Sequence, residues 1–491
     1  MTNPEEAFDI CAKRRAILEG AGHMLVLGGP GSGKTTIALL KARRSVLERL
    51  QPEQSVLFLS FSNAAIRRIL ESAGRVLTPE VARQIDIKTY HSFAWDILKS
   101  HGYLLAEKRR LEIIAAQDAA IIQAGMTDDA WSEVETRLFE QEGRVTYDQF
   151  APRAAELLER SSVARRCFSA AHPLILVDEF QDTDEDQWRL VQALSEDSDI
   201  IALGDTEQRI YAWRKGVSAT RLNDFAAGLK AETYDFQNEN NRSPATGIAG
   251  YARSLLSPDT VLELPDDIVF RRFRLGQFNV GVRVALIKTW NETVKRAGHR
   301  DLNIAVAARS RTMVRLISDV LSQRVTLGVK EHKPVRHDVM FDQLQITLAA
   351  RVVAHLLASQ NEDRNERLAG CLERVGDVFR SSGKVTAIKT SDRLGVWAGK
   401  CRDGKPPGTK CVKALVGVLD GLDASGFSGS PTEDWLIARR ALEDADADEL
   451  KRTGGHARYL RLLRRGSAIE EQLASLWRDQ GTYQGAEVAL D

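Results

Sequence analysis

Two adjacent carboxylates, Asp178 and Glu179, follow four apolar residues in the segment LILVDEFQDTD, residues 174–184. The apolar run predicts a buried parallel strand that is covered on both faces. Carboxylates at the carboxyl end of such a strand lie where open α/β sheets place their ligands. An Asp there can hold Mg²⁺, and the neighbouring Glu can take a proton from water. The alternative is a strand followed by an acidic helix start, capped by Thr183, whose acids the helix dipole favours.

A second segment, far upstream, has the composition of a phosphate-binding loop. Residues 24–27 are apolar, and the next eight read GGPGSGKT, which fits G-x-x-x-x-G-K-[ST]. In this pattern backbone N–H groups surround phosphate oxygens, Lys34 adds a positive charge, and Thr35 offers a hydroxyl to Mg²⁺. Together the two segments predict a site for a nucleoside triphosphate. Its predicted nucleotide-binding residues are Gly28, Gly29, Pro30, Gly31, Ser32, Gly33, Lys34, Thr35 and Thr36, and its predicted metal ligands are Thr35 and Asp178.

Polar and aromatic residues follow two other predicted strands. The strand at 56–60 is followed by Phe61 and Asn63, and the next strand by the segment KTYHSF, which contains His91 and Phe93. Polar groups hold phosphates and rings stack on bases, so this composition suits a strand of nucleic acid. In the alternative interpretation the rings are core aromatics and the polar residues are helix caps. Spacing alone favours that alternative.

A further predicted strand at 200–203 leads into the segment GDTEQRIYAWR, residues 204–214. Gln208 follows the strand end closely enough to reach a γ-phosphate. Trp213 can stack on a base, and the adjacent Arg214 can hold a phosphate. These residues extend the same predicted site.

The composition limits the remaining function classes. A chain of 491 residues is too long for one core and predicts about three domains. Basic and acidic residues balance at 68 each, so a nucleic-acid partner would have to bind a local patch. Five cysteines without a CxxC pair argue against a zinc site or a disulfide framework. Without a signal peptide or a membrane-spanning apolar run, the sequence predicts a cytoplasmic protein with no membrane partner.

The order of these segments resembles that of the UvrD/Rep-like superfamily 1 DNA helicases. The resemblance covers residues 20–245 with specific motifs and the next hundred more loosely. It implies ATP and Mg²⁺ as cofactors, movement in the 3′ to 5′ direction, and single-stranded DNA and its junction with duplex as partners. By this resemblance Glu179 is the general base, Gln208 senses the γ-phosphate, and Arg242 is an arginine finger. The DNA-binding residues that it implies are Phe61, Asn63, His91, Phe93, Tyr211, Trp213 and Arg214.

The resemblance implies an α/β fold with a RecA-like parallel sheet as the first motor domain. A helical insertion without strands and an incomplete second RecA-like domain, opened by a strand at 302–309, are expected to follow. The predicted boundaries are 1–102 with 170–245 for the first motor domain, 103–169 for the insertion, 246–345 for the second domain and 346–491 for a helical, basic region.

Three features depart from the family. The segment upstream of the loop has Lys13 and Arg14 where the family carries a Gln that reads adenine, and Asn241 replaces a Tyr that stacks on it. Adenine recognition is therefore less secure than the phosphate chemistry. The last two motifs of the family are not found in the sequence. A second arginine for the γ-phosphate and the strands that complete the second motor sheet are missing with them. We therefore expect that a partner supplies these strands, that the sequence is a fragment, or that the second domain is shorter.

Two alternatives stay open at this stage. Between residues 380 and 413 nine basic residues face two acids, which suits contact with duplex DNA or a solvated helix surface. The leading function is an ATP-dependent helicase or translocase in DNA repair or phage defence. The other is a nucleotide-gated DNA-binding subunit that regulates a partner nuclease or repair protein. The sequence selects neither.

Overall fold

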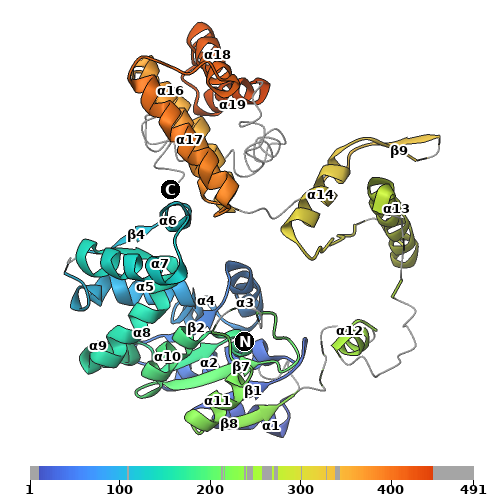
Figure 1. Cartoon of the computed structure of the whole chain (residues 1–491). Helices are drawn as coiled ribbons and strands as arrows, with labels where there is room; N and C mark the ends of the chain where they lie inside the picture. The colour runs from blue at the N-terminus through green and yellow to red at the C-terminus, as the bar shows by residue number, and fades with distance from the viewer. Residues whose placement is uncertain are drawn as a thin grey trace. The chain divides into compact units, whose positions relative to one another are not determined.

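The chain forms two compact units, Met1–Ile114 with Asp129–Val269 and Ala115–Asp128 with Phe270–Asp491 (Figure 1). The structure is a computed structural model. It describes residues 10–107, 110–211, 214, 216–236, 239, 241, 247–256, 268–269, 272, 275–299, 301–327, 329–337 and 343–445. Within those ranges, no helix combines the length and the hydropathy that a membrane crossing needs.

The first unit is built on a parallel sheet of six strands in the order β3-β2-β6-β7-β1-β8. Its strands are β1 (Met24–Leu27), β2 (Val56–Ser60), β3 (Ile85–Thr89), β6 (Leu174–Val177), β7 (Asp199–Gly204) and β8 (Glu232–Asp235). The predicted α/β fold with a P-loop sheet is confirmed. The order places β7 between β1, which leads into the predicted phosphate loop, and β6, which leads into the two carboxylates.

Helices cover both faces of this sheet, because successive strand residues point to opposite sides. In β2, Val56 and Phe58 join one buried cluster, whereas Leu57 and Leu59 join the other. The helices on the first face are α1 (Ala12–Glu19), α2 (Lys34–Glu48), α3 (Asn63–Val76) and α4 (Pro79–Ala82). The helices on the second face are α5 (Tyr90–His101), α8 (Phe150–Arg160), α9 (Ser162–Ala171), α10 (Glu185–Ser195) and α11 (Arg221–Gly228). The unit also contains α12 (Ile248–Leu256).

The predicted insertion at 103–169 differs from the expectation in two respects. It contains two strands, β4 (Glu112–Ile114) and β5 (Arg144–Thr146), which pair in parallel; each has only three residues, too few for an alternating pattern to be recognised. Its helix α6 (Ala116–Gln123) belongs to the second unit, where Asp118 accepts a hydrogen bond of 2.8 Å from Arg351. Besides α8 and α9, the other elements here are η2 (Gly102–Leu104), α7 (Asp128–Arg137), η3 (Leu138–Glu142) and η4 (Tyr147–Gln149). The predicted division into four domains stays a prediction.

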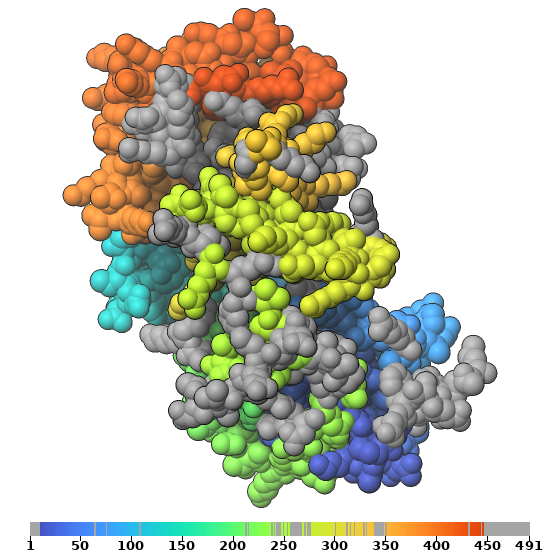
Figure 2. Space-filling model, turned by 90° about the vertical axis from the view of Figure 1, so that its right-hand side faces the viewer, coloured from blue at the N-terminus to red at the C-terminus, as the bar shows by residue number. Residues whose placement is uncertain are grey.

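The second unit is mainly helical. Its core lies among the last five helices, α15 (Gln343–Ala358), α16 (Arg364–Arg380), α17 (Val385–Arg402), α18 (Lys410–Ser425) and α19 (Pro431–Asp444). The preceding elements are η6 (Leu275–Gln277), α13 (Phe278–Ala297), α14 (Arg311–Ser322), β9 (Val325–Leu327) and β10 (Lys330–His332). Only Arg283 of α13 is buried, and Figure 2 shows side chains of α13, in yellow-green, at the surface.

The predicted opening strand of a second motor domain, at 302–309, is wrong. These residues form neither helix nor strand, and most of their side chains are exposed. Their alternating apolar pattern suits a strand, but a strand also needs a neighbour to accept its hydrogen bonds. In the part of the chain that the structure describes, none pairs with them.

Arginines of the basic region connect its helices. Arg402 of α17 donates to Glu366 and Glu373 of α16, with nitrogen–oxygen distances of 2.9 and 2.5 Å. Arg380 of α16 pairs with Asp392 of α17 at 2.8 Å. Part of the positive charge that suggested duplex contact is therefore compensated within the unit.

A candidate nucleotide and nucleic-acid site

The predicted phosphate loop connects β1 to the N-terminus of α2. Gly31 and Gly33 have φ angles of 81° and 90°, which a residue with a Cβ rarely adopts. The Gly28 N–H donates to the Gly204 carbonyl of the adjacent strand β7 at 3.1 Å. Lys34 turns its ammonium group back into the loop, where it donates to the carbonyls of Gly28 and, at 3.3 Å, Gly29. The sequence folds here as a tight turn that leads directly into the start of α2.

This loop fits a bound phosphate chain. The first turn of α2 contains no acidic residue, so its N-terminal dipole is uncompensated. The Ser32 hydroxyl is buried and has no hydrogen-bond partner among the described residues. A Cβ at Gly28 would come within 2.4 Å of that hydroxyl, so the close approach needs glycine. Thr35 and Thr36 lie in the first turn of α2, and Thr35 offers the hydroxyl expected for Mg²⁺.

Asp178 and Glu179 lie at the carboxyl end of β6. The Asp178 N–H donates to the Leu59 carbonyl at 2.9 Å, and its side chain is 9 % exposed. Burial, then the Glu179 charge, raise the pKa of Asp178 to about 6, whereas Lys34 opposes this shift. A buried carboxylate of this kind gains from a cation, so its chemistry fits Mg²⁺. Glu179 has a φ of 51°, an uncommon left-handed conformation for a non-glycine residue.

Thr183 does not cap the following helix. The Asp184 carboxylate accepts a hydrogen bond from the Gln187 N–H at 2.9 Å, and the Gln187 side-chain oxygen accepts one from the Asp184 N–H at 3.2 Å. This reciprocal arrangement is a capping box. Thr183 is instead fully buried beside Tyr90, whose hydroxyl lies 3.5 Å away.

Gln208, the predicted sensor of the γ-phosphate, follows β7. Its side-chain amide donates to the Asp205 carboxylate at 2.8 Å. The Gln181 side chain, from the segment that carries the carboxylates, donates to the Gln208 carbonyl at 3.2 Å. Hydrogen bonds thus join the segments after β6 and β7.

Two of the predicted base-contacting rings, Phe61 and Tyr211, lie close together in the first unit. Phe61 lies 5.2 Å from Tyr90 and 6.3 Å from Tyr211, measured between ring centroids. Phe61, Tyr211 and His91 are partly exposed. Burial lowers the pKa of His91; the Asp148 carboxylate opposes this shift, and the positive charge of Arg214 reinforces it.

Phe93 is a core residue, and its predicted contact with DNA is wrong. Its ring is 1 % exposed and packs edge-to-face against Phe168 and His172. In α5 it points to the sheet, so the alternative interpretation of this ring was the correct one. Asn63 begins α3, but its side chain is not described. Trp213 and Arg242 lie outside the described residues.

Two basic residues near the site were not predicted from the sequence. Arg14 donates to the Ser32 carbonyl of the loop at 3.2 Å, pairs with Glu239, and lies 5.1 Å from the centre of the Phe236 ring. Arg68 of α3 lies close enough to lower the pKa of Asp178. The signals in the sequence were the position of Arg14, in the slot of the missing Gln, and the place of Arg68 in the basic helix that follows β2.

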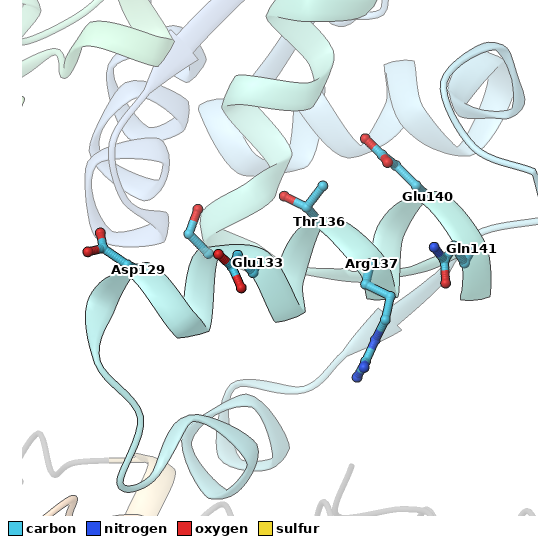
Figure 3. A pocket seen from close by; sticks show the side chains of 7 residues that line it. Asp129, Glu133, Thr136, Arg137, Glu140 and Gln141 are labelled. Atoms are coloured by element: carbon cyan, nitrogen blue, oxygen red, sulfur yellow. The ribbon is translucent and has the colours of Figure 1, made fainter.

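A hollow of about 410 Å³ is lined by residues of α7 and η3, and none of the predicted site residues lines it. Figure 3 shows its side chains spaced along one helix, with Asp129 at one end and Gln141 at the other. Three of the seven lining residues are acidic, which does not suit a phosphate or a nucleic acid.

Comparisons with known proteins agree with this geometry. Residues 13–214 match a family model described as an AAA domain. The putative ATP-dependent DNA helicase YjcD of Bacillus subtilis is 26 % identical over 273 residues, which cover 47 % of this chain and 36 % of that protein. DNA helicase II of Haemophilus influenzae is 24 % identical over 291 residues, 50 % of this chain and 40 % of that protein.

A third relative is the RecBCD enzyme subunit RecB of Mycolicibacterium smegmatis, 33 % identical over 147 residues, 29 % of this chain and 14 % of that protein. In all three cases the match spans less than half of the relative's length. The matched residues include the loop, the paired carboxylates and the segment after β7. This N-terminal region is similar to the UvrD/Rep-like superfamily 1 DNA helicases.

Proposed function

We propose that the chain is an ATP-dependent DNA motor, a helicase or translocase that moves along single-stranded DNA in the 3′ to 5′ direction. The observation that carries the proposal is the hydrogen-bonded connection between the carboxylates after β6 and the segment after β7, where Tyr211 lies beside Phe61. This connection joins a site for phosphate chemistry to rings that can stack on bases. The similarity of residues 13–214 to DNA helicases supports the same conclusion.

The proposed hydrolysis is an in-line attack of water on the γ-phosphate of ATP. Thr35 and Asp178 are the residues that would hold Mg²⁺, which would neutralise charge on the phosphates when bound. Lys34 stabilises the developing charge on the β- and γ-phosphates, and Glu179 takes the proton of the attacking water. Gln208 senses the γ-phosphate. The proposed arginine finger is Arg242, which would compensate charge in the transition state.

The proposed DNA contacts are made by Phe61, His91, Tyr211 and Arg214. The rings stack on bases, which is tolerant of sequence because every base has a π-face. Arg214 holds a backbone phosphate. A role in DNA repair or phage defence, like the cytoplasmic location, is a prediction from the resemblance.

The second candidate is a nucleotide-gated DNA-binding subunit that regulates a partner enzyme and unwinds little. It is favoured by the match to RecB, a protein whose name makes it a subunit of a larger enzyme. Both candidates use the same nucleotide site. They differ in whether DNA accelerates hydrolysis.

The test is steady-state ATPase activity of the full chain with and without single-stranded DNA, for the wild type and Glu179→Gln. We expect DNA to stimulate the wild type, and Glu179→Gln to lower turnover by roughly 10²–10⁴-fold because the general base is lost. The matched control is Glu196→Gln, a carboxylate on the surface that pairs with Arg165. An unchanged rate in Glu179→Gln would remove the proposed mechanism. Nucleotide-dependent DNA affinity without stimulated hydrolysis would support the second candidate.

The direction of movement needs a separate measurement. Strand displacement is compared on duplexes with a 3′ single-stranded tail and on duplexes with a 5′ tail. We expect displacement from the 3′ tail alone. Equal activity on both substrates would contradict the proposed direction and leave the hydrolysis mechanism untouched.

A further inference from the structure

A buried side-chain amide, that of Gln181, lies between the two carboxylates and the segment after β7. Gln181 is 1 % exposed and belongs to the short helix η5 (Phe180–Asp182). The phosphate chemistry described above gives it no role. A polar group buried this completely normally has a partner for each of its hydrogen-bonding atoms.

The hydrogen bonds of this amide use both of its N–H donors and one of the two lone pairs of its oxygen. Nε2 donates to the Glu179 carboxylate at 2.7 Å and to the Gln208 carbonyl at 3.2 Å. Oε1 accepts the Asp205 N–H at 3.0 Å. An amide flip would place Oε1 against two oxygen acceptors and Nε2 against a donor, so the orientation is determined. The amide therefore connects the Glu179 carboxylate directly to two residues of the segment after β7.

The two ends of this connection differ in rigidity. η5 is held in the core by Phe180, which is fully buried and packs edge-to-face on Trp188 and Phe225. The segment after β7 lies nearer the surface, and Ile210 is 65 % exposed. The segment can therefore move relative to η5, and such a movement would displace the side-chain amide of Gln181.

A second bond runs in parallel. The Asp182 carboxylate, next to Gln181 in η5, accepts the Tyr211 N–H at 3.1 Å. Tyr211 lies beside Phe61, in the proposed base-stacking site. A base that enters between these rings would move the backbone of Tyr211, and with it the carbonyl of Gln208 three residues earlier.

We propose that Gln181 is a positioning residue that transmits the binding of single-stranded nucleic acid at Tyr211 to the carboxylate of Glu179. The inference rests on the proposed function, because it needs hydrolysis that nucleic acid stimulates. Gln181 contacts neither the nucleotide phosphates nor the DNA in this scheme. Gln181 fixes the position of Glu179, which has an uncommon left-handed backbone conformation, relative to the segment that contains Gln208 and Tyr211.

The test compares the wild type with Gln181→Met, which keeps the shape of the side chain and removes all three hydrogen bonds. We measure ATPase turnover with and without single-stranded DNA, KM for ATP, and the melting temperature. We expect the stimulation by DNA to fall by ~10-fold or more, because small misplacements of a catalytic group are costly. KM should stay within about twofold, because the phosphate loop is unchanged.

Two further variants separate coupling from folding. Gln187→Met removes another buried amide, in the capping box of α10, and should leave the stimulation unchanged. Gln181→Glu keeps the oxygen that accepts the Asp205 N–H. It replaces the amide nitrogen by a second oxygen, which cannot donate to the Glu179 carboxylate or the Gln208 carbonyl and is repelled by both. It should lose the stimulation even if Gln181→Met does not fold.

The outcomes distinguish this inference from the proposed function. If DNA stimulates hydrolysis by the wild type, and both Gln181 variants are stimulated to within twofold of the wild type, the inference is overturned and the proposed function stands. A wild type without DNA-stimulated hydrolysis would overturn the motor and the inference together. A rise of KM together with a fall of turnover and melting temperature, with stimulation retained, would make Gln181 purely structural and overturn the inference.

Discussion

Replacement of the buried Arg221 by leucine should destabilise the first unit strongly. Arg221 begins α11, is 2 % exposed, and holds the end of the carboxylate-bearing segment. Its Nε donates to the Thr183 carbonyl at 3.1 Å, and its Nη2 donates to Glu185 at 2.8 Å. Its guanidinium group lies 5.8 Å from the centre of the Trp188 ring.

The magnitude follows from the environment of each contact. The buried bond to Thr183 involves a charged donor and contributes about 1.5–3 kcal/mol. The Glu185 side chain is 62 % exposed, so that ion pair contributes less than ~1 kcal/mol. The cation–π contact contributes about 0.5–2 kcal/mol. We expect a loss near ~3 kcal/mol, which lowers the melting temperature of a unit of this size by about 6–12 °C.

Thermal unfolding of the full chain, followed by fluorescence, measures the effect. The matched control is Arg189→Leu, which removes ion pairs with Glu159 at 2.7 Å and Asp186 at 3.0 Å. The Arg189 side chain is 36 % exposed, so its two pairs should contribute less than ~1 kcal/mol together. Equal shifts in the two variants would refute the reasoning, because burial of the arginine would then not matter.

Two further predictions concern pH and the nucleotide base. Burial raises the pKa of Asp377 to about 6, so the folded chain binds its proton more tightly and loses stability as pH rises from 4 to 7. Asp377→Asn should therefore stabilise the chain by about 1–2 kcal/mol at pH 7.5 and hardly at pH 4, in urea unfolding; equal effects at both values would contradict this. Because Arg14 replaces the adenine-reading amide, turnover with GTP should lie within about tenfold of that with ATP. A preference for ATP above a hundredfold would show another adenine contact.

Much of the candidate site could be predicted from local sequence pattern. The phosphate loop and the paired carboxylates each follow an apolar run of four residues, and such runs form strands wherever both faces are covered. Parallel strands align their carboxyl ends at one edge of the sheet, so the two segments had to lie near each other once the strands were recognised. The spacing of Gly28, Gly33 and Lys34 is local too, because one turn of backbone surrounds the phosphate.

Other features depended on which segments pack together. Phe93 and Phe61 look alike in sequence, but Phe93 points to the sheet and Phe61 lies at its edge. The strands β4 and β5 are too short for a pattern, and residues 302–309 have the pattern without a pairing neighbour. Gln181 acquires its role only through bonds to a segment more than twenty residues away. The burial of a residue and its hydrogen-bond partners depend on which segments pack around it in the folded chain, and the local sequence pattern does not specify them.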